Sequence, residues 1–109
     1  MKKYEEYYSN LNKEVINFIE ENKLEEYINF AIDTITKYLS LHRIVFDLYL
    51  DFFEDFFNRD LRILRIVVRC KNYDEYSFFY LWRSLISITK SSIPEDICSK
   101  IAIKLENES

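Results

Sequence analysis

The sequence of 109 residues contains no glycine and a single proline, Pro94. Globular chains usually contain about 7 % glycine, so its absence is a strong deviation. Phosphate-binding loops of the GxGxxG and GxxxxGK[ST] types need glycine for tight turns and close backbone approach, and both are absent. Two-residue β-hairpins also favour glycine, because their central residues take positive φ. The sequence therefore argues against a nucleotide-binding loop and a hairpin-rich sheet, and it favours helices.

Apolar residues recur at helical spacing along the whole chain, and no linker or repeat divides it. The length fits one domain, 1–109, with ends expected to fray at about 1–3 and 107–109. The hydrophobic fraction of 49 % is enough to build a core. We therefore predict an all-α fold, a compact single-domain bundle of five or six short, mostly antiparallel helices.

The pattern predicts a first helix that ends at Asn22, since asparagine tolerates the left-handed conformation that closes a helix. A second helix is expected from Leu24 to a break near residue 41. Without that break it would reach Phe57, which is long for so small a domain. The third helix then covers residues 44–57.

The fourth predicted helix, residues 60–70, follows a turn at residues 58–60. Its β-branched residues favour a strand. Strict alternation fails, however, and Arg62, Arg65 and Arg69 lie at i, i+3 and i+7, so a helix is preferred. A fifth helix is expected after Asp74 as N-cap. The S-x-x-E capping box at residues 92–95 predicts the start of a last helix. Its inward-facing residues are Ile97, Cys98, Ile101, Ala102 and Leu105.

The residues that catalysis requires are scarce. His42 is the only histidine, and Cys70 and Cys98 have no metal-ligand spacing. Asp47 and Asp51 would share a helix face, but such pairs usually just face water. We predict no catalytic residues, no metal and no cofactor, and therefore no enzyme. The thiols are expected to be buried and reduced, and His42 to be a polar surface or capping residue.

Charge is the most informative feature of the sequence. The net charge is −4, so nucleic acid and anionic membranes are poor default partners and a basic protein is a better one. Residues 47–55 carry a net −4 and residues 59–71 a net +4. The two blocks are expected on consecutive helices joined by a short turn, and antiparallel packing of these helices would bring the acidic and arginine stripes side by side.

The N-terminal third combines eight acids with interleaved tyrosines. Tyrosine rings can anchor a partner while carboxylates steer its approach. The chain is thus predicted to be a non-enzymatic protein-binding module, such as an immunity or inhibitor protein that neutralises a basic nuclease toxin. The predicted partner-binding residues are Tyr4, Tyr7, Tyr8, Glu14, Glu21, Glu25, Asp47, Asp51 and Glu54.

An alternative hypothesis is a nucleic-acid-binding regulator, of viral or mobile-element origin, that contacts phosphates through its arginine stripe. The residues of this stripe are Arg59, Arg62, Arg65 and Arg69. The nearby acidic stripe weakens the hypothesis, because it would repel the same polyanion. Amino acids with AT-rich codons predominate, which is typical of such genomes. Nucleic acid is therefore a less favoured partner than a basic protein.

A second aromatic cluster comprises Tyr76, Phe79, Tyr80, Trp82 and the adjacent Arg83. We expect these rings mainly in the core, and a homodimer seam is the alternative. No apolar run is long enough to span a bilayer, and no apolar segment follows the first residues. The prediction is a cytoplasmic protein with no membrane contact.

Overall fold

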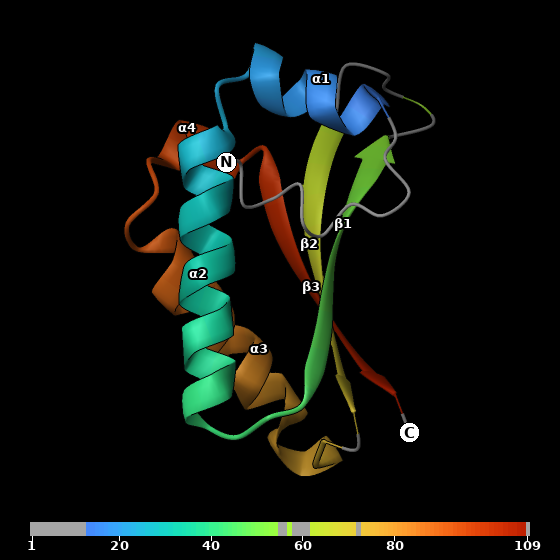
Figure 1. Cartoon of the computed structure of the whole chain (residues 1–109), viewed down its shortest axis with the longest axis vertical. Coiled ribbons are helices and arrows are strands. Elements are labelled where there is room, and N and C mark those ends of the chain that lie inside the picture. The colour runs from blue at the N-terminus through green and yellow to red at the C-terminus, as the bar shows by residue number, and fades with distance from the viewer. Residues whose placement is uncertain (1–12, 55–56, 58–61, 72, 109) are drawn as a thin grey trace.

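The computed structural model describes residues 13–54, 57, 62–71 and 73–108, and these residues form an α+β fold (Figure 1). The prediction of an all-α bundle is therefore wrong. Four helices and three strands occur among the described residues. In chain order they are α1 (Lys13–Glu21), α2 (Glu25–Leu41), β1 (Phe46–Glu54), β2 (Arg62–Lys71), α3 (Glu75–Lys90), α4 (Glu95–Cys98) and β3 (Ile101–Glu108).

The three strands form one mixed sheet in the order β1-β2-β3. β1 and β2 are antiparallel, and Phe46 lies opposite Cys70. β2 and β3 are parallel, and Leu64 lies opposite Ile101. Parallel strands need a long crossover, which α3 and α4 supply. The central strand β2 is thus paired along both of its edges.

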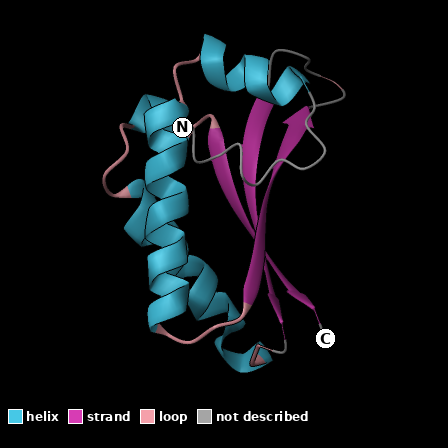
Figure 2. Cartoon of the chain, viewed as in Figure 1, coloured by secondary structure: helices cyan, strands magenta, loops and turns pink. Residues whose placement is uncertain are grey.

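The helices cover one face of the sheet, with α1 lying across its end (Figure 2). β2 supplies four fully buried side chains to this helix-covered face, namely Leu64, Ile66, Val68 and Cys70. α2 presents five buried side chains to the same core, namely Ile28, Ala31, Ile32, Ile35 and Leu39. Each large aliphatic side chain buried in this way stabilises the fold by about 1.5–3 kcal/mol.

The predicted helix over residues 44–57 is wrong, because residues 46–54 form β1. Side chains alternate across the strand, and Leu48 is buried in the core between two exposed or half-exposed neighbours, Asp47 and Tyr49. Because apolar residues lie on both faces of the strand, their spacing in the sequence resembles that of a helix with a broad apolar face. The alternation is therefore masked in the sequence.

The predicted helix over residues 60–70 is also wrong, because residues 62–71 form β2. In a strand, Arg65 and Arg69 share one face and Arg62 lies on the other, so the arginines do not form a helical stripe. Val67 lies on the arginine face and is nevertheless fully buried. The β-branched content indicated the strand correctly.

The C-terminal segment differs as well. The last helix ends at Cys98, and residues 101–108 form β3. The predicted capping box is wrong, because α4 begins after Pro94 and has no side-chain cap. Ile101 and Ile103 point into the core on either side of the less buried Ala102, which is the alternation of a strand.

Other predictions are confirmed. α2 ends at Leu41, and the exposed His42 is its C-cap. Asp74 caps α3, and its carboxylate accepts a hydrogen bond from the Tyr76 backbone N–H at 3.1 Å. Cys70 is buried as predicted, whereas Cys98 is only half-buried, so the prediction of two buried thiols is wrong for Cys98. Burial raises the pKa of the Cys70 thiol, so this thiol stays protonated at neutral pH.

Two helices end without glycine by placing a basic residue in the left-handed region. Lys23 has φ 55° and Arg43 has φ 58°. After α1 the backbone N–H groups of Lys23 and Leu24 donate to Glu20 and Ile19. This hydrogen-bond pair is a Schellman motif, and the turn after α2 repeats it. The prediction that Asn22 holds the left-handed position is wrong by one residue.

We expect Lys23→Gly and Arg43→Gly each to raise the free energy of unfolding by about 0.5–1 kcal/mol. Glycine removes the Cβ clash of the left-handed region, and part of this gain is lost to the greater freedom of the unfolded chain. Urea unfolding followed by circular dichroism measures the change. As a control, Asn22→Gly should destabilise the fold, because the Asn22 side chain donates to the Phe18 carbonyl at 2.9 Å. A less stable Lys23→Gly variant would contradict this account.

Candidate partner-binding surfaces

The face of the sheet that carries no described helix forms a network of charges, which we call the open face. Its cations are Arg65, Arg69, Lys71 and Lys104, and its acids are Asp47, Asp51 and Glu106. Each cation has an acidic partner: Arg65 bonds Asp51, Lys71 approaches Asp47 at 3.4 Å, and Lys104 approaches Glu106 at 3.2 Å. Arg69 approaches Glu106 at 3.1 Å.

Aromatic rings reinforce this network. The guanidinium of Arg69 lies 5.6 Å from the centre of the Tyr49 ring, and that of Arg65 lies 5.8 Å from the centre of Phe53. The Tyr49 hydroxyl donates to Glu106 at 3.4 Å. Such cation–π contacts stabilise by about 0.5–1 kcal/mol at exposed sites. The arginines are therefore held in place by contacts within the sheet.

The acidic and arginine stripes do run side by side, as expected, although on strands and not on helices. Asp47 lies opposite Arg69, Asp51 opposite Arg65, and Glu54 opposite Arg62. A nucleic acid would have to compete with the carboxylates that already bind Arg65 and Arg69. Arg59 lies outside the described residues. The geometry thus weakens the hypothesis of a phosphate-binding arginine stripe.

The predicted partner-binding residues that the structure describes lie on α1, α2 and β1. Asp47 and Asp51 belong to the ion pairs of the open face. Glu14 and Glu21 are exposed on α1, and Glu25 is half-buried at the start of α2. Tyr4, Tyr7, Tyr8 and the side chain of Glu54 lie outside the described part of the structure. The described acids of this set are therefore divided between the helices and the sheet.

Helices α1 and α2 with their connection, residues 13–41, form what we call the acidic layer. They contain six acids and three lysines, a net −3 out of the −4 of the whole chain. On α2, Glu26 and Asp33 flank Phe30 at helical spacings of four and three residues, so the three share one side of the helix. Phe30 is 39 % exposed. An apolar ring thus lies among carboxylates on this layer.

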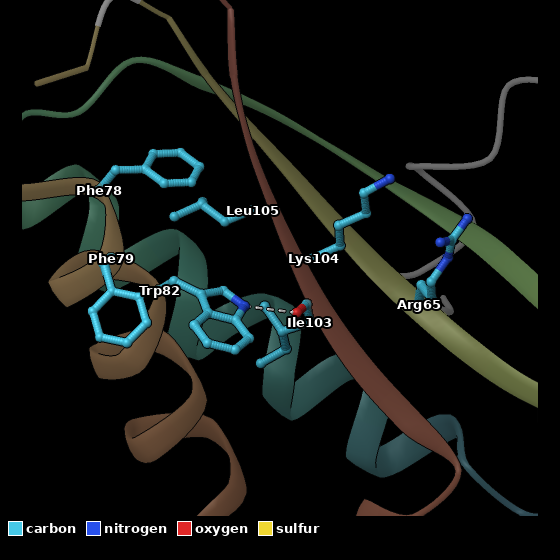
Figure 3. Close-up of a pocket in the computed structure, with 7 residues that line it drawn as sticks. All are labelled: Arg65, Phe78, Phe79, Trp82, Ile103, Lys104 and Leu105. Carbon is cyan, nitrogen blue, oxygen red and sulfur yellow. Dashed lines mark hydrogen bonds between the residues drawn. The ribbon is translucent and has the colours of Figure 1, made fainter. Parts of the chain in front are cut away.

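A hollow of about 370 Å³ lies between α3 and the outer edge of β3 (Figure 3). Phe78, Phe79 and Trp82 line its helical side, while Lys104 and Arg65 lie across the strand. The Trp82 ring N–H donates to the Ile103 carbonyl at 3.1 Å. This bond occupies one acceptor on the free edge of β3, which limits pairing with another strand there. The lysine and the arginine are already bonded to acids.

A second hollow, of about 250 Å³, lies between the end of α2 and α3. It is lined by Tyr38, His42, Ile44, Tyr73, Ser77, Tyr80, Leu81 and Ser84. The rings of Tyr38 and His42 are 4.4 Å apart. Among the described residues, no group of three or more His, Cys, Asp or Glu could hold a metal ion. No helix of the described residues is long and apolar enough to cross a membrane.

The expectation that the second aromatic cluster lies in the core is wrong for three of its rings. Tyr76, Phe79 and Tyr80 are exposed on α3, while Trp82 is half-buried. Sequence reasoning also missed Glu106 and Lys104, which complete the charge network. The alternation of Lys104 and Glu106 with apolar residues in 101–106 was the available signal.

No protein-family model matches the sequence, and no curated protein or solved structure matches it either.

The network of the open face predicts a specific pH dependence. Hydrogen bonds from Lys104 and Arg69 lower the pKa of the Glu106 carboxyl below its ordinary value of 4.5. Because the pKa of Glu106 is lower in the folded protein than in the unfolded chain, its ionised carboxylate stabilises the fold above pH 4.5. This stabilisation is lost as the pH falls through the folded-state pKa. We expect Glu106→Gln to unfold at lower urea concentration than the wild type at neutral pH, and the difference to shrink progressively below pH 4.5.

Urea titrations at several pH values test this dependence. The control Glu95→Gln removes the same charge from the exposed surface of α4, outside the network. A Glu106→Gln effect that stays constant down to acidic pH would contradict the assigned ion pairs.

Proposed function

We propose that the chain is a non-enzymatic protein-binding module that binds a basic partner through its acidic layer. The observation that carries the proposal is the division of charge in the fold. The acidic layer has a net charge of −3 out of the −4 of the whole chain, whereas the charged side chains described on the open face comprise four cations and three acids. The unbalanced negative field is therefore centred on α1 and α2, where it steers a cationic protein.

The same layer supplies an apolar contact. Phe30 lies between Glu26 and Asp33 on one side of α2. Aromatic residues, phenylalanine included, are enriched in protein interfaces, and the rim around an interface core is polar. Blocking the cationic active site of a nuclease-type toxin requires complementary charge and an anchor but no catalytic groups. An immunity- or inhibitor-type role is consistent with this surface.

The proposal predicts that neutralising the acidic layer weakens capture of the partner. The test variant is Glu21→Gln/Glu26→Gln, and the matched control is Glu95→Gln/Asp96→Asn on α4. All four side chains are exposed, and both variants remove two negative charges. Each variant and the wild type serve as bait in a native lysate of the source cells, and the captured proteins are quantified by mass spectrometry.

We expect the wild type and the control to capture the same basic protein in equal amounts. The test variant should capture about tenfold less of it, because it lacks two of the charges that steer the partner. Raising NaCl from about 0.15 to about 0.5 M should also weaken capture, because the Debye length falls from about 8 to about 4 Å. A captured partner that is acidic, or insensitive to both changes, would contradict the proposal.

A further inference from the structure

One face of α3 exposes three large aromatic rings. Tyr76 is 91 % exposed, Phe79 56 % and Tyr80 69 %. They lie at i, i+3 and i+4, so they share one side of the helix. Single exposed rings are ordinary, but contiguous apolar groups on one face of a small domain mark an interaction site. We call this surface the α3 face.

Phe79, the central ring of the α3 face, contacts the side chains of its neighbours on the helix. The centre of the Phe79 ring lies 6.2 Å from that of Tyr80 and 6.1 Å from that of Trp82. The guanidinium of Arg83 lies 5.8 Å from the centre of the Phe79 ring. Trp82 is in turn fixed to β3 by its bond to Ile103. A face that is already ordered loses little conformational entropy when it binds.

The charges of the α3 face are arranged symmetrically about Phe79. Glu75 lies four residues before it and Arg83 four residues after it, and both are exposed. In a helix each charge is therefore about 6 Å along the axis from Phe79, on the same side of the helix. If two copies of α3 cross antiparallel at Phe79, Glu75 of each copy is level with Arg83 of the other.

We propose that the protein forms a two-fold symmetric homodimer in which the α3 faces of two copies pack antiparallel around Phe79. A two-fold interface uses the same patch on both subunits, so the patch must be complementary to itself. The α3 face meets this requirement with rings at its centre and opposite charges at its ends. The dimer uses a different surface from the acidic layer and does not depend on the proposed function.

A second copy fits this face better than a strongly charged partner does. A uniformly basic surface would meet Arg83, and a uniformly acidic one would meet Glu75, and like charges across an interface are costly. A second α3 places an acid opposite each arginine. It also supplies rings to cover the exposed Tyr76 and Tyr80.

Sedimentation equilibrium of the full chain between about 5 and 500 µM tests the proposal, because dimer formation depends on concentration by mass action. The wild type should show a concentration-dependent dimer. Phe79→Asp, which places two carboxylates at the two-fold axis, should remain monomeric throughout. Far-ultraviolet circular dichroism confirms that this variant of an exposed position is folded.

A charge-swap cycle then identifies the interface. Glu75→Arg and Arg83→Glu should each raise the dimer dissociation constant about tenfold or more, because each variant brings like charges together twice. The double variant Glu75→Arg/Arg83→Glu restores opposite charges and should return the constant to within about threefold of the wild type. The matched control Glu95→Arg makes the same change on α4 and should leave dimerisation unchanged.

A wild type that stays monomeric at about 500 µM would overturn the proposal, and the α3 face would then be open to another protein. A dimer that persists in Phe79→Asp would overturn it as well. So would a double variant no better than the single variants, because the antiparallel pairing of Glu75 with Arg83 would then be absent. The variants of the acidic layer leave α3 intact, so the two proposals fail independently.

Discussion

The pairing of the central strand β2 along both of its edges is the constraint on which the rest of the structure depends. On the helix-covered face four of its side chains, Leu64, Ile66, Val68 and Cys70, are fully buried, and the exposed Arg62 lies at the start of the strand. On the open face it presents Arg65 and Arg69 between β1 and β3. Two cations in the middle of a sheet need partners within a strand spacing. The neighbouring strands supply Asp51 on β1 and Glu106 on β3, which form ion pairs with Arg65 and Arg69.

The open face also explains why the strands resemble helices in the sequence. Val67 is apolar on the charged face of β2 and is fully buried, with Tyr49 and Lys104 as its cross-strand neighbours. Long side chains can cover an apolar residue while their polar ends stay in water. Tyr49 and Phe53 likewise interrupt the alternation of polar and apolar residues in β1. Both rings lie on the open face, where the guanidinium groups of Arg69 and Arg65 pack over them. Periodicity fails where both faces of a strand are partly apolar.

Elements with one clear apolar face were predictable. The break after Leu41 and the cap at Asp74 both follow from local chemistry and both occur. The proximity of the acidic and arginine stripes was also predictable, because it depends on a short connection and not on the type of element. The parallel position of β3 was not predictable, because it depends on how α3 packs on the sheet. The ion pair that Glu106 of β3 forms with Arg69 was missed for the same reason.

The change of fold class alters what the acidic composition means. In a helical bundle Asp47 and Asp51 would lie on a solvated face and could contribute to a partner surface. In the sheet they form ion pairs with Lys71 and Arg65. Carboxylates that neutralise their own neighbours produce little field at a distance, whereas a net charge acts over about a Debye length. The negative charge that a partner would sense is therefore centred on α1 and α2. The α3 face, with one acid and one arginine at its ends, suits a partner of the same kind as itself.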